Sequence, residues 1–154
     1  MNDLNLQLPR IARVLEWAFA LLGGLSGLSI ILGFLVNAGA TQSLGSLFPF
    51  PLLYLIELFF AVLMGAMSVF LNKGTRTTLL AALPWITAGI LLAFVALGSA
   101  AFGPGLVLPM LAFLIAGVLT DLRQGGSLLA HAGLLLLVAV IQAFLMFVNL
   151  IVLA

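Results

Sequence analysis

Four polar side chains within otherwise apolar stretches are the residues of this sequence that could do chemistry. They are Glu57, His131, Gln142 and Asn149. Ionisable and amide groups inside long hydrophobic segments are costly in lipid, and they often take part in moving ions or protons. Each of the four therefore requires either a hydrogen-bond partner or a function.

Glu57 lies roughly 10 Å inside a hydrophobic segment, counted at 1.5 Å per residue. No basic residue is expected at that depth, so the carboxyl group should be protonated, because desolvation disfavours its charged form. Glu57 shares one helical face with Ala61 and Gly65. It could serve as a proton-relay or coupling-ion carboxylate. The favoured interpretation is a neutral acid that donates one hydrogen bond to a neighbouring helix or to another subunit.

His131, Gln142 and Asn149 are spaced so that, at 100° per residue, they return to within about 20° of one direction. They form one polar stripe along the last hydrophobic segment. Gln142 falls at the level of Glu57, which predicts a contact between these two side chains or, failing that, a polar partner that both share. His131 lies near the other end of the segment, too far along the axis to meet Glu57.

His131 is the only histidine, and the chain has no cysteine. The chain alone therefore supplies neither a bis-histidine haem site nor a zinc site, and no metal site is predicted. No cofactor is predicted either. The minor alternative is a single axial ligand, through His131, to a haem or a chlorophyll-type pigment.

Two further acidic residues, Glu16 and Asp121, each have a basic residue close by in the sequence. Glu16 follows Arg13 by one helical turn, which predicts an interfacial salt bridge between the two. Asp121 and Arg123 fall in a polar break and are expected to be a solvated loop pair.

The amino-acid composition predicts the class of protein in which these residues lie. The 154 residues are 65% hydrophobic and 6% charged, with a mean hydropathy of +1.40, whereas soluble domains carry about 25% charged residues. A chain of this size cannot bury so much apolar surface in water. The net charge of +1 also provides no basic field for nucleic acid. The sequence thus predicts an all-α integral membrane protein.

A hydrocarbon core of about 30 Å needs roughly 20 apolar residues in a helix. Punctuation by Gly, Pro and polar residues predicts a single membrane domain, 1–154, with an interfacial N-terminal segment at 1–13. Five transmembrane helices follow, at about 14–36, 50–71, 77–101, 104–120 and 127–154. The fourth is short and should borrow from the turn before it. A cleaved signal peptide ending near Ala40 is disfavoured, because its apolar stretch would be too long.

Basic residues predict the orientation of these helices. With five spans, all five Lys and Arg residues fall on one side of the membrane. The positive-inside rule then places the N-terminus in the cytoplasm and the C-terminus outside, in a plasma (inner) membrane.

Small residues recur at four-residue spacing on four of the five helices and predict close packing between them. They are Gly23, Gly27, Ala61, Gly65, Gly89, Ala93, Ala112 and Ala116. Phenylalanines of the outer half are expected to face lipid; they are Phe48, Phe50, Phe59, Phe60, Phe94 and Phe102.

No paired carboxylate, Ser–His–Asp set, phosphate-binding glycine loop or HExxH motif is present, so an enzyme is not expected. The favoured function is a non-catalytic accessory or assembly subunit of a larger membrane complex, one that is energy-transducing, for example in electron transport. Its expected partners are other membrane subunits and the lipid bilayer, not nucleic acid or soluble nucleotides. The alternatives are a small oligomeric proton-coupled transporter or channel that uses Glu57, and a subunit that holds a pigment or haem through His131.

Overall fold

The structure is a computed structural model that describes residues 2–41, 52–72, 78–97 and 103–153, and over these residues it is helical with short turns. The elements are α1 (Asn2–Thr41), α2 (Leu52–Leu71), α3 (Thr78–Leu97), the 3₁₀ turn η2 (Gly103–Leu106), α5 (Val107–Gln124) and α6 (Leu128–Leu153). Five helices are long and apolar enough to cross a membrane. The chain is therefore a multi-pass membrane protein, as its composition predicts.

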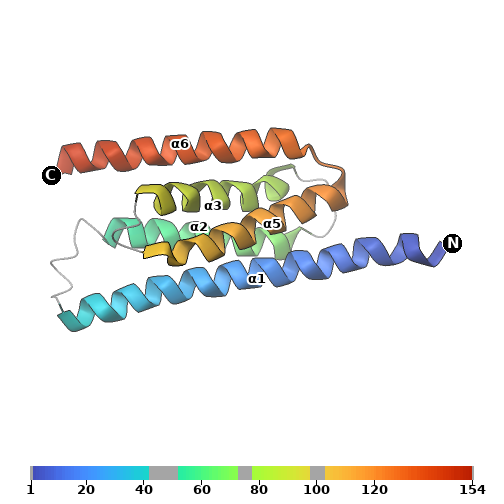
Figure 1. Ribbon diagram of the computed structural model, residues 1–154, viewed down its shortest axis with the longest axis horizontal. Coiled ribbons are helices and arrows are strands. Elements are labelled where there is room, and N and C mark those ends of the chain that lie inside the picture. The colour runs from blue at the N-terminus through green and yellow to red at the C-terminus, as the bar shows by residue number, and fades with distance from the viewer. Residues whose placement is uncertain (1, 42–51, 73–77, 98–102, 154) are drawn as a thin grey trace.

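The helices form a bundle in which α1 and α6 lie on opposite sides (Figure 1). Helix α1 packs against α5 and α2, while α3 packs against α2, α5 and α6. Helix α3 is thus the most enclosed, and α6 is attached to the bundle mainly through it. In its most apolar stretch α3 has 56% of its residues buried, against 17% for α6.

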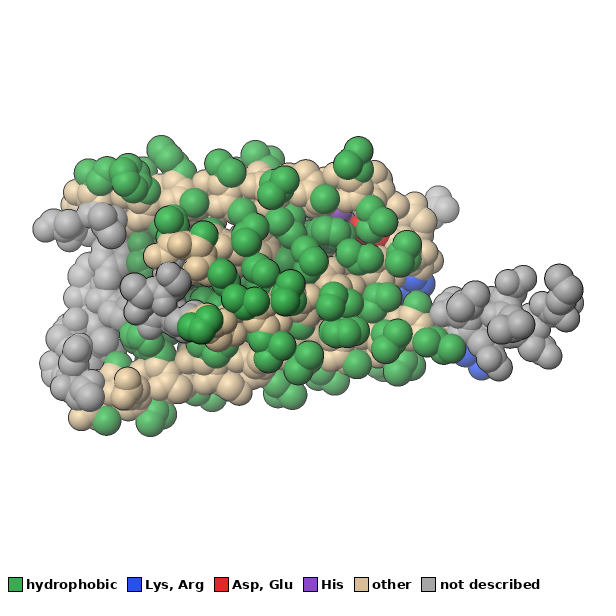
Figure 2. Space-filling model, in the orientation of Figure 1, with side chains coloured by type: hydrophobic (Ala, Val, Ile, Leu, Met, Phe, Trp, Pro, Cys, Tyr) green, Lys and Arg blue, Asp and Glu red, His purple; other side chains and the backbone are tan. Residues whose placement is uncertain are grey.

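A cluster of large apolar side chains fills the space between the helices. Leu58, Leu91, Phe94 and Phe113 are completely buried within it. The outer surface is also apolar, and Figure 2 shows hydrophobic side chains along the whole length of the bundle. Such a surface suits a lipid bilayer, because the hydrocarbon chains around the bundle are as apolar as its core.

Two helices extend beyond the predicted membrane spans. The first helix is continuous from Asn2 to Thr41, so it includes the span at 14–36 and, from Asn2 onward, the segment at 1–13. The fourth continues past Thr120 to Gln124, where Gly125, in the left-handed conformation at φ 69°, provides the C-cap. As predicted, this helix borrows its first turn, here η2, from the preceding loop.

Glycine permits the closest approaches between helices. A Cβ atom on Gly27 would lie 2.8 Å from Val62 of α2, and one on Gly65 would lie 2.6 Å from Thr87 of α3. A Cβ on Gly89 would lie 2.6 Å from the backbone oxygen of Leu135 on α6. The other predicted packing residues are also buried; they are Gly23, Ala61, Ala93, Ala112 and Ala116.

The outer phenylalanines only partly behave as predicted. Phe59 and Phe60 are exposed on α2. Phe94 is completely buried instead of facing lipid, and its ring lies edge-on to Tyr54 at 5.6 Å between centroids. It is buried because α3 is covered on several sides by other helices. Phe48, Phe50 and Phe102 lie outside the described residues.

Candidate functional site

Polar side chains gather in two clusters at opposite ends of the bundle. The basic-end network contains Glu16, Asn72, Trp85, Thr120, Asp121, Arg123, Gln124 and His131. The Glu57 cluster contains Tyr54, Glu57, Gln142 and Asn149. The two clusters are about 22 Å apart along α2, taken from Glu57 to Asn72 at 1.5 Å per residue.

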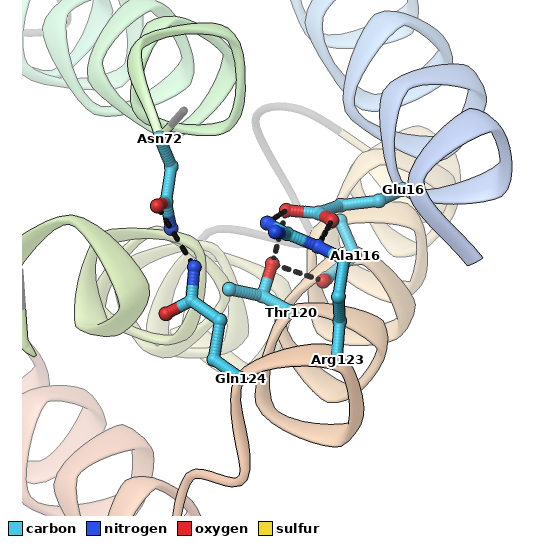
Figure 3. Close-up of polar contacts among 6 residues, drawn as sticks. All are labelled: Glu16, Asn72, Ala116, Thr120, Arg123 and Gln124. Carbon is cyan, nitrogen blue, oxygen red and sulfur yellow. Dashed lines mark hydrogen bonds and ion pairs between the residues drawn. The ribbon is translucent and has the colours of Figure 1, made fainter. Parts of the chain in front are cut away.

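A buried ion pair between α1 and α5 is the centre of the basic-end network (Figure 3). Nε of Arg123 donates to Oε2 of Glu16 at 2.9 Å, and Nη2 donates to Oε1 at 3.2 Å. The hydroxyl of Thr120 lies 2.7 Å from the same Oε1 and 2.9 Å from the carbonyl oxygen of Ala116. Glu16 is completely buried, and the Arg123 side chain is 11% exposed. Two-point geometry of this kind is among the stronger charge-assisted contacts in proteins.

The predicted partner of Glu16 is therefore wrong. Arg13 instead places its guanidinium 5.5 Å from the ring centroid of Trp17, which is partly exposed. A pair between neighbouring residues on an exposed helix face contributes little. Glu16 faces α5, where a fully buried carboxylate needs a full set of donors.

The histidine of α6 is held by an acid of α5. Nδ1 of His131 lies 2.8 Å from both carboxylate oxygens of Asp121. Because a carboxylate only accepts hydrogen bonds, Nδ1 carries the proton. The Trp85 ring of α3 stacks on the imidazole at 6.2 Å between centroids. Asp121 is 1% exposed, so the predicted solvated pair of Asp121 and Arg123 is also wrong: each residue instead pairs with a different helix.

The end of α2 is joined to α5 by an amide pair. Nε2 of Gln124 donates to Oδ1 of Asn72 at 2.8 Å (Figure 3). Two buried donors of this network, Nδ2 of Asn72 and Nε1 of Trp85, have no hydrogen-bond partner among the described residues. The indole nitrogen of Trp85 lies over Gly117 of α5, where a Cβ atom would come within 2.8 Å. Close packing of α3 on α5 is thus obtained at the cost of one indole hydrogen bond.

A serine starts the helix that carries His131. The amide of Ala130 donates to Oγ of Ser127 at 3.3 Å, so Ser127 is the N-cap of this helix. On the preceding side, the amide of Gly126 donates to the carbonyl oxygen of Asp121 at 2.9 Å. These two bonds define a short α5–α6 connection, and this shortness brings Asp121 and His131 together.

At the other end of the bundle, the side chain of Gln142 on α6 lies beside Glu57 of α2, so the predicted contact between the two is present. Tyr54, one turn before Glu57, lies beside the side chain of Asn149. Its hydroxyl also lies 3.4 Å from the carbonyl oxygen of Met146. Glu57 is partly buried, and Gln142 is buried. The polar stripe of α6 thus divides: His131 belongs to one cluster, and Gln142 and Asn149 belong to the other.

The chemistry available to these clusters is limited. Within the described ranges, no group of three or more His, Asp or Glu residues could hold a metal ion. Thr120, the hydroxyl nearest in sequence to the Asp121–His131 pair, bonds to Glu16 and to its own helix. The geometry in the described ranges is that of charge neutralisation and helix-to-helix hydrogen bonding.

The sequence contained a usable signal for the basic-end network. Thr120, Asp121, Arg123 and Gln124 form a polar run directly before Gly125–Gly126. If the helix is taken to end at the glycine, as helices often do, this run becomes its last turn. Its side chains then face neighbouring helices instead of a solvated loop.

Removing the carboxylate of Asp121 should destabilise the α5–α6 connection. We expect Asp121→Ala to lower the free energy of unfolding by about 1–3 kcal/mol, because His131 loses the acceptor for its ring N–H. Asp121→Asn, which retains an acceptor oxygen, should lose less than half as much. Unfolding by added SDS in detergent micelles, followed by tryptophan fluorescence, measures both. Equal losses for the two variants would contradict the assigned hydrogen bond.

Comparison of the chain with models of protein families, with curated proteins and with solved structures finds no match.

Proposed function

We propose that this protein is a non-catalytic accessory or assembly subunit of a larger, energy-transducing membrane complex. It binds its partners through the outward faces of its transmembrane helices. In this proposal the basic end faces the cytoplasm, the C-terminus lies outside, and the protein resides in the plasma (inner) membrane. Positive charge at the ends of short-looped helices supports this orientation.

The observation that carries the proposal is the attachment of α6. This helix packs mainly against α3 alone, and its most apolar stretch is 17% buried. Its outward side chains include Leu136, Val140, Phe144 and Phe147, each at least 60% exposed. A helix bound along one side offers most of its circumference to a neighbouring transmembrane helix, and membrane helices associate through such packing.

The contacts that the polar side chains make with other helices of the same chain support a non-catalytic function. Glu16 and Asp121 each have an intrachain hydrogen-bond partner, and Glu57 lies beside the side chain of Gln142. Catalytic acids and nucleophiles instead need access to a substrate. The contacts present join α1 to α5, α5 to α6 and α2 to α6, and so they maintain the bundle that presents α6.

Site-specific photo-crosslinking in the native membrane tests this proposal. A photoreactive residue at Val140 or Phe144 of α6 should crosslink to one distinct membrane protein. The same residue at Phe60, which is 56% exposed on α2, serves as the control for random collisions. Crosslinks from α6 to lipid alone, or to a second copy of this chain alone, would refute the accessory-subunit proposal.

A second candidate function, a proton-coupled transporter or channel, is favoured by the position of Glu57. Among the described basic side chains, Arg123 lies in the last turn of α5 and bonds to Glu16 of α1, and Arg10 and Arg13 precede Glu16, so all three lie toward the other end of the bundle. Glu57 lies beside Gln142 without a neighbouring cation among the described residues, an arrangement in which a carboxyl group can hold and release a proton.

Glu57→Gln distinguishes the two functions, since glutamine preserves size and hydrogen bonding but cannot release a proton. We expect the variant to keep its stability within about 0.5 kcal/mol and to crosslink to the same partner as the wild type. Proton uptake into liposomes that contain the purified protein provides the second measurement. Proton flux in the wild type that disappears in Glu57→Gln would replace the accessory role with the transport role.

A pigment- or haem-holding function through His131 is the third candidate. With Nδ1 donating to Asp121, Nε2 is the ring nitrogen that retains a lone pair, the arrangement common in metal-ligating histidines. The absorption spectrum of the protein purified from its native membrane tests this candidate, because the band of a bound tetrapyrrole should shift or disappear in His131→Leu.

A further inference from the structure

The N-terminal part of α1 extends beyond the rest of the bundle. Helix α1 has 40 residues, which corresponds to about 60 Å, twice the thickness of a hydrocarbon core of about 30 Å. In Figure 1 its N-terminal end projects past all the other helices. Near this end of the bundle, Glu16 of α1 bonds to Thr120 and Arg123 close to the end of α5. Arg10 and Arg13 precede Glu16 on α1 by one to two turns, and they therefore lie at the boundary where the bundle ends.

Two arginines at this boundary have no acidic partner among the residues whose side chains the structure describes, which on α1 begin at Arg10. Arg10 is exposed, and Arg13 contacts the face of Trp17. Glu16, the nearest described carboxylate on the same helix, is buried and bound to Arg123. Arg10 and Arg13 thus provide two positive charges that the described part of the bundle does not neutralise.

An open apolar groove lies directly beside these charges. It is shallow, with a volume of about 250 Å³, and the described residues that line it, Arg10, Ile11, Val14 and Leu15, all belong to α1. The three apolar side chains are 43–66% exposed. The surface thus combines a cationic end with an apolar floor, and Trp17, whose ring type prefers the membrane interface, lies one turn further along the helix.

We propose that this surface binds an anionic phospholipid. Its phosphate accepts hydrogen bonds from the guanidinium groups of Arg10 and Arg13, and the first part of an acyl chain lies in the groove formed by Ile11, Val14 and Leu15. The guanidinium fork matches the geometry of a phosphate. The apolar floor favours a lipid over an acidic peptide, because a peptide segment would leave backbone polar groups against the side chains of Val14 and Leu15.

Tryptophan quenching by brominated lipid reports binding at this place. The chain has two tryptophans, and Trp85→Phe leaves Trp17 as the single reporter. Trp85 is buried and its indole N–H has no partner among the described residues, so phenylalanine should be tolerated there. In liposomes of equal brominated fraction, brominated phosphatidylglycerol should quench Trp17 more strongly than brominated phosphatidylcholine.

The charge variants show whether Arg10 and Arg13 cause the preference. At about 1 kcal/mol per basic residue near a membrane surface, Arg10→Gln/Arg13→Gln should weaken the preference for phosphatidylglycerol about 30-fold, and either single variant about 5-fold. The control Lys73→Gln/Arg76→Gln removes the same charge from another segment and should keep the preference. A third variant, Val14→Trp in a Trp17→Phe/Trp85→Phe background, places the reporter in the groove itself.

Three outcomes would overturn the proposal. The first is equal quenching of Trp17 by the two lipids in the Trp85→Phe protein. The second is an equal loss of preference in the control pair, which would show a general charge effect. The third is quenching of the groove reporter, the indole introduced by Val14→Trp, that does not depend on headgroup charge.

Discussion

Replacing Arg123 with leucine is expected to lower the free energy of unfolding by about 3–5 kcal/mol. Glu16 is completely buried, and two of its three side-chain hydrogen bonds come from Arg123. Without the guanidinium, the carboxylate must either remain charged in an apolar environment or take up a proton. SDS-induced unfolding in detergent micelles measures the loss, with the buried Trp85 as a fluorescent reporter.

The double variant Glu16→Leu/Arg123→Leu separates the effect of charge from that of packing. Replacing both partners of a buried pair with apolar residues is often neutral or stabilising, so the double variant should recover most of the lost stability. Arg10→Leu, at an exposed position of α1, is the matched control and should change stability by less than about 0.5 kcal/mol. A double variant as unstable as Arg123→Leu would show that the pair supplies more than charge neutralisation.

Helix number and the Glu57–Gln142 contact were predictable because both depend only on length and periodicity. A stretch of about 20 apolar residues spans the membrane wherever it occurs. The depth of a residue within such a stretch follows from 1.5 Å per residue. Glu57 and Gln142 needed only to be at the same depth and to face inward. Their distance from the helix ends gives the depth, and the helical period of 3.6 residues gives the direction.

The partners of Glu16 were not predictable in this way, because they depend on how two helices align. Glu16 lies against Thr120, Ala20 packs with Ala116, and Gly23 lies against Phe113. These contacts describe an antiparallel α1–α5 pair in one fixed register. That register results from fitting small residues against large ones across the interface. A single helix carries no information about it.

Replacing Gly89 with leucine is the second change expected to have a large effect. A Cβ atom at this position would lie 2.6 Å from the backbone oxygen of Leu135 and 3.2 Å from the side chain of Val138, both on α6. A backbone oxygen cannot rotate away as a side chain can, so the two helices must separate. Overpacking of this kind costs about 1–3 kcal/mol or more. Because α6 is attached mainly through α3, its separation should also disrupt the α6 face, and crosslinking from Val140 to a partner should be lost.

Gly33→Leu and Gly133→Leu provide matched controls for this experiment. Both glycines are helical and exposed, and a Cβ atom on either would meet nothing within 4 Å among the described residues. These variants add the same side chain to α1 and to α6, so stability and crosslinking should be unchanged, with Gly133→Leu testing α6 itself. Gly89→Ala adds only the Cβ and should show an intermediate loss. If Gly89→Leu instead behaved like the two controls, α3 and α6 would not be in contact at Gly89, and the assignment of α6 as a partner-binding helix held by α3 would have to be abandoned.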